Sequence, residues 1–477
     1  MKKIFAILMA ICLIASMLSI TAFAALLTEL DAAPVGTVLR VTANKGEDTV
    51  LIGDYTSFQD GWNDAMELAG DEDEMKDNGY ERIVVDLHTD WDANDDGEFT
   101  EEIWNGAGFD NDTIYVPTEA RVTLNLNGHT IDRDLSGLEL DGEVICVDEK
   151  ADLIINDGTI TGGFSENGAG GIHIKDGANV TLNNVNIVGN RASDDDGAGI
   201  AVYKDATLTM NGGSFKDNLA DVELGSIYAV QGSAVYVENG TAIFDGVTFE
   251  SNHTGHNNID GAAIYANEGE ITVKNCTFEG NGIEDSNKKI VSPYSIIHSV
   301  DGLLTITNSN FTNNKASYLF YVDESDFRME GGKVTKNSGE ELFYFEDSES
   351  ELTGVTITEN QSVVMHVNND HEIVNVIECV LDNNTPNDNN AAVELDKAGN
   401  LIMIDCVLGD TTFNDRSFAT FDGEAGVGSI FGEGSFSMIV SLVALIVSGL
   451  SIFLIVDMKK KLVPATANNT EANEDEE

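Results

Sequence analysis

The clearest chemistry in this chain is that of a hard cation. Residues 92–102 have the sequence DANDDGEFTEE, in which Asp92, Asn94 and Asp96 alternate and Gly97 follows. Ca²⁺ takes six to eight oxygen ligands, and short oxygen-bearing side chains at alternate positions before a sharp glycine turn can surround one ion. The spacing therefore predicts a calcium-binding loop.

The second half of this loop departs from an EF-hand-type calcium loop. Its twelfth position is Ile103, where that pattern has a bidentate Glu. Glu101 or Glu102 would have to supply the missing oxygens, helped by Asp110 or Asp112. A solvated loop rich in Asp, Asn and Gly is the alternative interpretation, and both stay open. The candidate ligands are Asp92, Asn94, Asp96, Glu98, Glu101 and Glu102.

A run of three carboxylates, Asp194 to Asp196, could belong to a polysaccharide-cleaving site. A lyase also needs a basic residue to take a proton, and a hydrolase needs paired acids with a suitable partner. Arg191 is the only basic residue beside the run. The sequence therefore favours a protein without catalytic activity.

Two histidine patterns could also carry chemistry. His253, His256 and Asp260 have a spacing that can hold zinc, but zinc sites usually show a stronger set of ligands. His129 stands alone, and a single His in a predicted core position is more often a packed residue than a catalyst. Neither pattern predicts a site by itself.

A repeat of 23 to 34 residues must position these loops. Its clearest copy is residues 261–281, GAAIYANEGEITVKNCTFEGN, with predicted strands from Ala263 to Ala266 and from Ile271 to Cys276. Each copy closes on an apolar residue, and repeats of this length stack on their neighbours as supersecondary units. The closing residues are Ile131, Ile160, Ile187, Phe215, Phe249, Phe278, Phe311, Val334, Ile357, Leu381 and Leu408.

Two further columns follow from the repeat. Period-two alternation places the residue two before each closing position on the same side of the strand, and this residue is small or apolar in nearly every copy, from His129 to Cys406. Columns of small and large residues side by side are typical of the interior of a parallel β-helix. Asn recurs three residues after the closing position, and buried stacked amides predict a hydrogen-bonded ladder. Its members are Asn190, Asn218, Asn252, Asn281, Asn314, Asn337, Asn360 and Asn384.

The segments GGIHI, GAGIAVY, GSAVYV and GAAIYA, each with a later Phe-x-x-Asn or its equivalent, resemble the GGAI and FxxN repeats of the polymorphic outer membrane protein family. More broadly, the chain is similar to bacterial surface proteins with right-handed β-helix passenger domains. The resemblance covers roughly residues 120–410 and implies a pectate-lyase-like solenoid, but repeats of this kind specify a fold far more than a partner. The chain departs from that family at its C-terminus, where one apolar segment follows the repeats.

The charge excludes one class of partner. The chain has 83 Asp and Glu against 25 Lys and Arg, for a formal net charge of −58. Such a surface repels nucleic acid and anionic lipid and attracts divalent cations. No nucleic-acid partner is therefore expected, and the acidic residues either keep a strand-rich protein soluble or bind ions.

Both ends of the chain predict a membrane-anchored protein. Residues 1–24 combine Lys2 and Lys3, an apolar core and a small-x-small cleavage site ending at Ala24, which is a signal peptide. Residues 436–456 are 21 uncharged residues, long enough to cross a bilayer, and Lys459 to Lys461 follow. Positive charge after the span places the tail in the cytoplasm and the repeats outside the cell.

An N-terminal cap is expected before the repeats. Runs from Thr37 to Thr42 and from Thr49 to Ile52 predict strands, and Ile83 to Leu87 predicts a third. Ser57 with Asp60 predicts the start of a helix with one apolar face. The open end of a β-helix needs such a cover. The apolar face comprises Phe58, Trp62, Ala65, Leu68 and Ala69.

Four cysteines remain after removal of the signal peptide, which contains Cys12. Cys379 and Cys406 occupy the same column in adjacent repeats, close enough for a disulfide. Side chains stacked in parallel register point the same way, which is poor geometry for that bond. Free buried thiols are therefore expected.

Together these features predict an all-β protein: a right-handed single-stranded parallel β-helix of about eleven rungs with an N-terminal helix cap and one C-terminal transmembrane helix. The expected function is that of an adhesin-like or scaffold protein that binds a surface protein or glycan of a host or neighbouring cell. The alternative is a membrane-tethered polysaccharide lyase or glycoside hydrolase. The ligand and the oligomeric state are not specified by the sequence. The predicted parts are a signal peptide (1–24), a cap with hairpin, helix and calcium loop (25–119), the β-helix (120–410), an end cap and stalk (411–435), the transmembrane helix (436–456) and a cytoplasmic tail (457–477).

Overall fold

The computed structural model describes residues 32–93, 109–110, 113–134, 142–165, 168–193, 197–221, 231–255, 259–282, 293–386, 390–397 and 400–422. All of these belong to the first of two compact units, residues 1–425. The predicted signal peptide and transmembrane segment lie outside the described residues. Within the described ranges, no helix is long and apolar enough to cross a membrane.

The described N-terminal part forms a small α/β element. Strand β1 (Leu39–Lys45) pairs antiparallel with β2 (Asp48–Tyr55) and with β3 (Arg82–Leu87), so the three predicted strands are present. Helix α2 (Phe58–Gly70) begins after Ser57, whose hydroxyl accepts a hydrogen bond from the Asp60 backbone N–H at 3.3 Å, and α3 (Glu72–Asn78) follows. The predicted apolar face of α2 is buried. Its Trp62 indole donates to the carbonyl of Tyr115 in β6 (Thr113–Val116), which ties the helix to the repeats.

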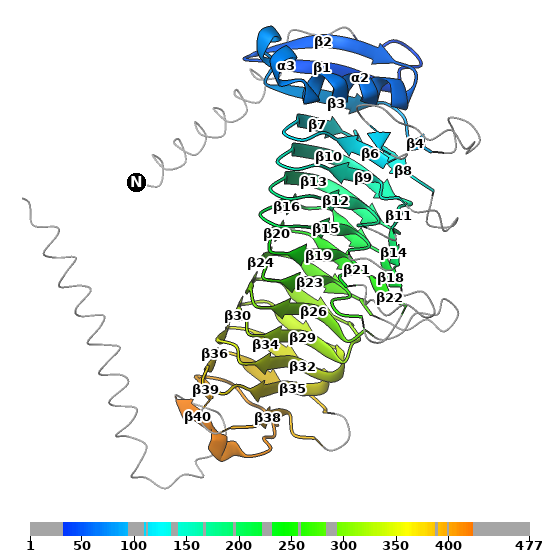
Figure 1. Cartoon of the computed structure of the whole chain (residues 1–477). Helices are drawn as coiled ribbons and strands as arrows, with labels where there is room; N and C mark the ends of the chain where they lie inside the picture. The colour runs from blue at the N-terminus through cyan, green and yellow to red at the C-terminus, as the bar shows by residue number, and fades with distance from the viewer. Residues whose placement is uncertain are drawn as a thin grey trace, which may run out of the picture. The chain divides into compact units, whose positions relative to one another are not determined.

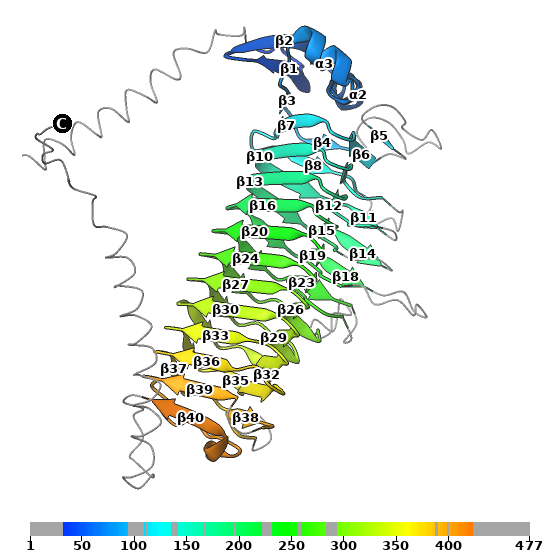
Figure 2. The same ribbon diagram turned by 60° about the vertical axis from the view of Figure 1, so that its left-hand side comes forward.

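The repeats wind through three sheets of stacked strands, which Figures 1 and 2 show as parallel rows. Sheet A continues from the N-terminal strands because β3 pairs parallel with β7. Sheet B follows a second side, and sheet C adds short strands in some rungs. Sheet A comprises β1–β3, β4 (Trp91–Asp92), β7 (Arg121–Asn125), β8 (Thr130–Asp132), β10 (Asp152–Thr161), β13 (Asn179–Val188), β16 (Thr207–Asn211), β17 (Ser214–Lys216), β20 (Thr241–Asp245), β21 (Thr248–Glu250), β24 (Glu270–Lys274), β25 (Thr277–Glu279), β27 (Leu303–Thr307), β28 (Asn310–Thr312), β30 (Asp326–Glu330), β31 (Lys333–Thr335), β33 (Ser350–Thr353), β34 (Thr356–Thr358), β36 (Val374–Ile377), β37 (Val380–Asp382), β39 (Leu401–Ile404) and β40 (Ala419–Asp422). Sheet B comprises β5 (Phe109–Asp110), β6, β9 (Ile145–Val147), β12 (Ile172–Ile174), β15 (Ile200–Val202), β19 (Val235–Glu238), β23 (Ile264–Asn267), β26 (Ser295–Val300), β29 (Tyr318–Asp323), β32 (Ser338–Glu346), β35 (Gln361–Asn368) and β38 (Val393–Leu395); sheet C comprises β11 (Phe164–Ser165), β14 (Arg191–Ser193), β18 (Leu219–Asp221) and β22 (His253–Thr254).

The clearest copy of the repeat bends once more than the sequence predicts. The strand expected from Ile271 to Cys276 ends at Lys274, and a separate strand, β25, begins at Thr277. The break lies at Asn275, whose φ of 53° is in the left-handed region. Asn tolerates this region better than most residues, so the chain turns there and starts a new strand.

The closing apolar residues lie in register, as predicted. Ile160 is paired with Ile131 and Ile187, and Phe249 with Phe215 and Phe278. The phenyl rings of Phe249 and Phe278 stack with centroids 4.4 Å apart in the core. Burial of such large apolar rings is worth about 2 kcal/mol each, which makes this column a main source of stability.

The column of small residues is also confirmed, with one exception. Gly158 lies so close to Leu126 that an added Cβ would meet its Cβ at 2.4 Å, and Cys276 is fully buried. His129, however, keeps 33% of its side chain exposed and contacts Asp90 at 3.1 Å, so its predicted inward position is wrong. The side chain of Leu126 is fully buried in the core of this rung, and His129 follows it after a turn at Asn127 and Gly128.

The stack extends beyond the point where the repeat pattern was expected to stop, Asp410. A short 3-10 helix, η2 (Arg416–Phe418), leads into β40, which pairs parallel with β39. Phe421 of β40 packs against the core. The segment was missed because it lacks the closing apolar residue and the Asn of the other copies.

The asparagine ladder is continuous from Asn190 to Asn384. Each side-chain amide nitrogen donates to the Oδ1 of the next Asn at 2.9–3.3 Å. The same nitrogen donates to the carbonyl of the closing residue one rung back, and the Oδ1 also accepts from the backbone N–H of the preceding Asn, as for Asn281. Every polar group of these buried amides therefore has a partner.

The four described cysteines are free and buried, as predicted. Burial raises the pKa of Cys276 to about 11 and that of Cys379 to about 12. Both thiols fill the small column, and Cys379 and Cys406 do not form a disulfide. Their role there is to pack the core.

We predict that Asn281→Ala destabilises the protein by about 3 kcal/mol or more, because it removes the acceptor of the buried Asn252 backbone N–H and breaks the ladder bonds to the Asn252 side chain and the Phe249 carbonyl. The Asn252 side-chain nitrogen keeps only its bond to the Phe215 carbonyl. Urea unfolding followed by circular dichroism measures this change. Asn211→Ala is the matched control, since Asn211 is exposed and its side-chain nitrogen donates one hydrogen bond, to Asn183 Oδ1. Equal effects of the two variants would contradict the ladder's role.

Candidate functional site

The outer face of sheet B carries a row of aromatic and histidine side chains, which we call the outer column. Its members occupy the middle of successive strands and are register partners from rung to rung. They alternate with core residues such as Ile264 and Ala266, so period two directs them away from the core. The outer column comprises Tyr115, Cys146, His173, Ala201, Tyr236, Tyr265, His298, Tyr321, Tyr344, His366 and Glu394.

The rings of this column are in contact. Tyr236 and Tyr265 stack with centroids 5.6 Å apart and planes within 2°, and Tyr265 lies 5.2 Å from His298. Tyr321 continues the row at 4.6 Å from His298. Tyr236, Tyr265 and His298 are buried, whereas Tyr321 is half-buried and offers an accessible edge.

Accessible tyrosines gather around rungs β26, β29 and β32. Tyr294 and Tyr318 lie beside the outer column, with Tyr294 5.4 Å from Tyr321 and Tyr318 5.3 Å from Tyr344. All four rings are half-buried. We call Tyr294, Tyr318, Tyr321 and Tyr344 the tyrosine cluster.

A pocket of about 370 Å³ opens within this cluster. Its floor includes His298, whose Nδ1 lies 3.3 Å from Asp260 Oδ1 and 3.5 Å from the Ser295 hydroxyl. These residues come from strands β26 and β29 and from the segments that precede β23 and β26. The pocket is lined by Asp260, Tyr294, His298, Tyr321 and Asp323.

Burial and neighbouring acids raise the pKa of three groups in the pocket, the hydroxyls of Tyr294 and Tyr321 and the carboxyl group of Asp323. Burial, together with Glu346, raises the pKa of Asp323 and of Tyr321. Tyr321 donates its hydroxyl hydrogen to Glu346 at 2.9 Å. The pKa of Tyr294 is raised by burial as well. The pocket thus offers neutral tyrosine donors beside carboxyl groups, which suits a polyhydroxylated ligand.

A second titratable cluster lies two rungs further on. His366 Nδ1 is 2.9 Å from Glu341 Oε1, and its Nε2 is 3.3 Å from Asp396 Oδ1. Burial alone would lower the pKa of His366, but the hydrogen bond and charge of Glu341, with the charge of Asp396, raise it to about 9. Glu394 also faces this histidine, and the Tyr344 ring packs against it at 5.1 Å. His366 is therefore an imidazolium held by carboxylates at neutral pH.

Most of the predicted calcium loop lies outside the described residues. Of its candidate ligands, only Asp92 is described; Asn94, Asp96, Glu98, Glu101 and Glu102 are not. Asp92 ends β4 and is the register partner of Asp132 in β8. Burial raises the pKa of Asp132, and so does the negative charge of Asp92 on the neighbouring strand.

The other sequence candidates do not come together among the described residues. Asp194 to Asp196 and His256 lie outside them. Arg191 pairs with Asp221 at 3.7 Å, and His253 lies 3.9 Å from Asp217. Asp260 is part of the pocket described above and contacts His298, a partner that the sequence did not indicate.

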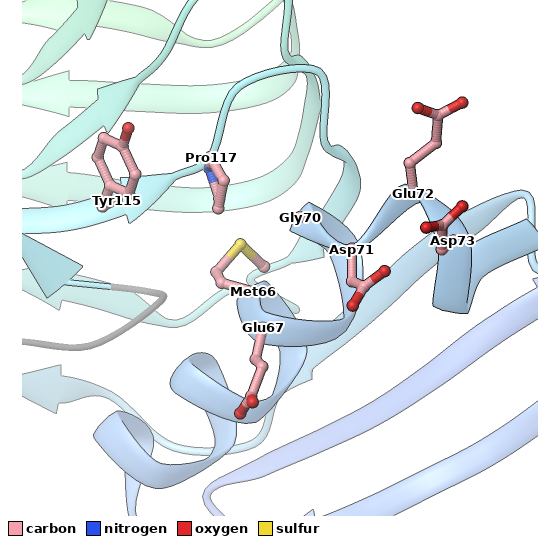
Figure 3. Close-up of a pocket in the computed structure, with 8 residues that line it drawn as sticks. All are labelled: Met66, Glu67, Gly70, Asp71, Glu72, Asp73, Tyr115 and Pro117. Atoms are coloured by element: carbon pink, nitrogen blue, oxygen red, sulfur yellow. The ribbon is translucent and has the colours of Figure 1, made fainter.

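A groove of about 560 Å³ between α2 and the first rungs is lined by acidic residues, but their side chains do not form a binding site. Figure 3 shows Met66 between the helix and strand β6, which carries Tyr115 and is followed by Pro117, with the carboxylates of Glu67 and Glu72 turned away from that strand. Asp71 is occupied as the N-cap of α3, accepting from the Glu74 N–H at 2.9 Å. The groove therefore has no converging set of polar groups.

The outer column was not among the predicted site residues. Its signal is present in the segments GGIHI, GAGIAVY, GSAVYV and GAAIYA, where the residue between inward-facing positions is His173, Ala201, Tyr236 or Tyr265. Aligning these middle positions would have shown the row. The pocket itself could not have been found so, since its residues lie 63 positions apart in sequence, from Asp260 to Asp323.

Comparison with protein families gives one match. Residues 119–297 match a family model described as a right handed beta helix region. No similar protein was found among curated proteins or among solved structures. Together with the mostly parallel sheets, the match fits a right-handed β-helix; it does not confirm the more specific GGAI and FxxN repeat family.

We predict that protonated His366 stabilises the folded protein at neutral pH and that this stabilisation is lost in alkaline solution. Its pKa in the folded state, about 9, lies above the value near 6.5 of an unfolded histidine, so its contribution is full below about pH 6.5 and is lost as the pH rises through 9. The free energy of unfolding, measured in urea from about pH 6 to about pH 10, should fall by about 1–3 kcal/mol more in the wild type than in His366→Gln. The exposed His371→Gln is the control and should keep the wild-type profile. Identical profiles for wild type and His366→Gln would contradict this assignment.

Proposed function

We propose that the chain is a membrane-anchored extracellular β-helix that binds a glycan on the outer face of sheet B. The observation that carries the proposal is the pocket at Asp260, His298 and Asp323 within the tyrosine cluster. Tyrosine rings offer flat apolar faces for the C–H faces of sugars, and their hydroxyls and the carboxyl groups offer partners for sugar hydroxyls. The half-buried tyrosine cluster spans the rungs of β26, β29 and β32, so a glycan could lie across these three rungs.

The same pocket favours glycoside hydrolysis as a second candidate function. Hydrolases of this type use two carboxyl groups, one of them protonated as the general acid. Asp260 and Asp323 line one pocket, and the raised pKa of Asp323 suits the acid. A lyase is less well supported, because none of the five lining residues is Lys or Arg.

The extracellular location is supported by the sequence alone, through residues 1–24 and 436–456. In this arrangement the N-terminal element caps the stack. Phe58 of α2 stacks against Trp91 at 4.3 Å and Trp62 is fully buried, so the helix covers apolar surface that an open first rung would expose. The cap also limits edge-to-edge aggregation outside the cell.

We also propose that Ca²⁺ binds at the loop that begins with Asp92. The register pairing of Asp92 with Asp132 supports this, since a cation between the two carboxylates would relieve their repulsion. The ion would hold the loop against the first rungs as a structural clip.

We predict that Asp323→Asn weakens glycan binding about tenfold, or about 1.4 kcal/mol, because the pocket loses a charged acceptor for sugar hydroxyls. Binding is measured on a glycan array and then by titration of the best-bound glycan, with assay of new reducing ends. Asp326→Asn is the matched control, since Asp326 lies three residues away but is exposed on sheet A.

Each outcome of this experiment is informative. Binding without cleavage supports the adhesin-like function, and reducing ends that vanish in Asp323→Asn support the hydrolase. Equal binding by the two variants, or no binding at all, would refute a glycan site in this pocket and favour a protein partner.

We predict that Ca²⁺ raises the melting temperature by about 2 °C or more relative to EDTA, because an ion that binds only the folded state stabilises it. Differential scanning fluorimetry of the wild type and Asp92→Asn measures the shift. The shift should shrink in Asp92→Asn and persist in Asp326→Asn. A wild type with the same melting temperature in both buffers would rule out a structural calcium clip.

A further inference from the structure

Three potential metal ligands converge on the outer face of sheet B, near the start of the stack. Cys146 of β9 and His173 of β12 are register partners in adjacent rungs, and Glu143 lies three residues before Cys146. A ligand atom from each lies within 4.8 Å of those of the other two. His173 Nδ1 is 3.6 Å from Glu143 Oε1. This cluster shares no residue with the pocket.

Cys146 differs from the other described cysteines in its place in the rung. Cys276, Cys379 and Cys406 occupy the inward column of small residues, where they contact backbone carbonyls such as that of Phe244. Cys146 belongs to the outer column, so packing of the core does not account for it. It is 5% exposed and lies beside an imidazole and a carboxylate.

The surroundings hold these ligands in place. The His173 ring packs against Tyr203 with centroids 5.0 Å apart. Gly168 approaches so closely that an added Cβ would lie 2.7 Å from His173 Nδ1, so a larger residue there would displace the ring. The backbone and the neighbouring ring therefore limit the orientations of the imidazole.

The charges around the cluster suit a dication. The carboxylate of Glu143 and a thiolate at Cys146 would together neutralise two positive charges. The nearest cation, Lys175, is paired with Asp148 at 3.3 Å, and Asp148 also accepts a hydrogen bond from the Tyr115 hydroxyl. Lys175 also interacts with Cys146, where its positive charge favours the thiolate, the form that binds a metal.

We propose that Glu143, Cys146 and His173 bind one zinc ion, with water as the fourth ligand. A set of one sulfur, one nitrogen and one oxygen is typical of Zn²⁺ and unsuited to Ca²⁺ or Mg²⁺, which take oxygen ligands. Binding breaks the S–H bond of Cys146, forms an S–Zn bond and releases the proton to solvent, so affinity falls as the pH is lowered. Three protein ligands leave one position open, as in zinc sites that bind a further ligand.

The test is cobalt substitution in the purified full-length chain. Co²⁺ bound by a thiolate gives a near-ultraviolet charge-transfer band, and tetrahedral coordination gives visible bands. We expect one Co²⁺ per chain, displaced by Zn²⁺, and loss of the charge-transfer band in Cys146→Ser. Cys276→Ser is the matched control and should keep the band, since Cys276 lies in the core. The cluster of Glu341, His366 and Glu394 contains no sulfur and cannot give this band.

Two further variants separate a metal site from a folding defect. Glu143→Gln and His173→Gln should weaken Zn²⁺ binding at least tenfold while the circular dichroism spectrum stays that of the wild type. Native mass spectrometry counts the bound zinc. A wild type without the charge-transfer band, or a band that persists in Cys146→Ser, would overturn the proposal.

Discussion

The hydrogen bonds of the buried asparagine ladder constrain every rung from Asn190 to Asn384. The Oδ1 of each Asn accepts hydrogen bonds from the preceding Asn, and its Nδ2 donates to a carbonyl one rung back. Because these contacts fix the position of each Asn, the segment that leads to it can vary little in length. From the sheet B strand to the ladder Asn the spacing is 17 to 19 residues, for example Ile264 to Asn281. From the ladder Asn to the next sheet B strand it ranges from 5 to 17 residues. Insertions are therefore confined to the segments that lead into sheet B.

Because the insertions lead into sheet B, they lie next to its strands in sequence. Variable segments on a rigid scaffold are where solenoids usually build binding surfaces. Parallel register turns one repeated strand position into a continuous row, with ring centroids 4.6 to 5.6 Å apart from Tyr236 to Tyr344. The same face holds the pocket, the imidazolium of His366 and the cluster at Cys146, so three kinds of polar chemistry share one side of the stack.

The acidic composition acts locally as well as globally. The formal net charge of −58 gives the chain an excess of acidic side chains throughout. On sheet B, Glu346 and Glu341 lie beside tyrosines and His366, and they favour the neutral phenol and the charged imidazole. These acids therefore influence the protonation states of Tyr321 and His366 on the outer face of sheet B.

The sequence by itself determined the repeat, the inward columns, the asparagine ladder and the free core thiols. These features arise from local periodicity. Period two assigns the two faces of each strand, and equivalent residues of successive repeats become neighbours when the repeats stack in register. The N-terminal helix was equally predictable, because Ser57 and one apolar face are local signals. The bend at Asn275 was missed because it depends on a left-handed backbone angle. The exposure of His129 was missed because it depends on Leu126, whose side chain occupies the core position of that rung.

Only the tertiary structure decided which polar residues meet. Glu143 and His173 are 30 positions apart, and Asp260 and Asp323 are 63 apart, with different spacings through different rungs. Their encounter depends on the length of each segment that returns to sheet B and on the register of the strand that follows. Neither is encoded in a local pattern, because register is fixed by burial and hydrogen bonding between rungs that are distant in sequence.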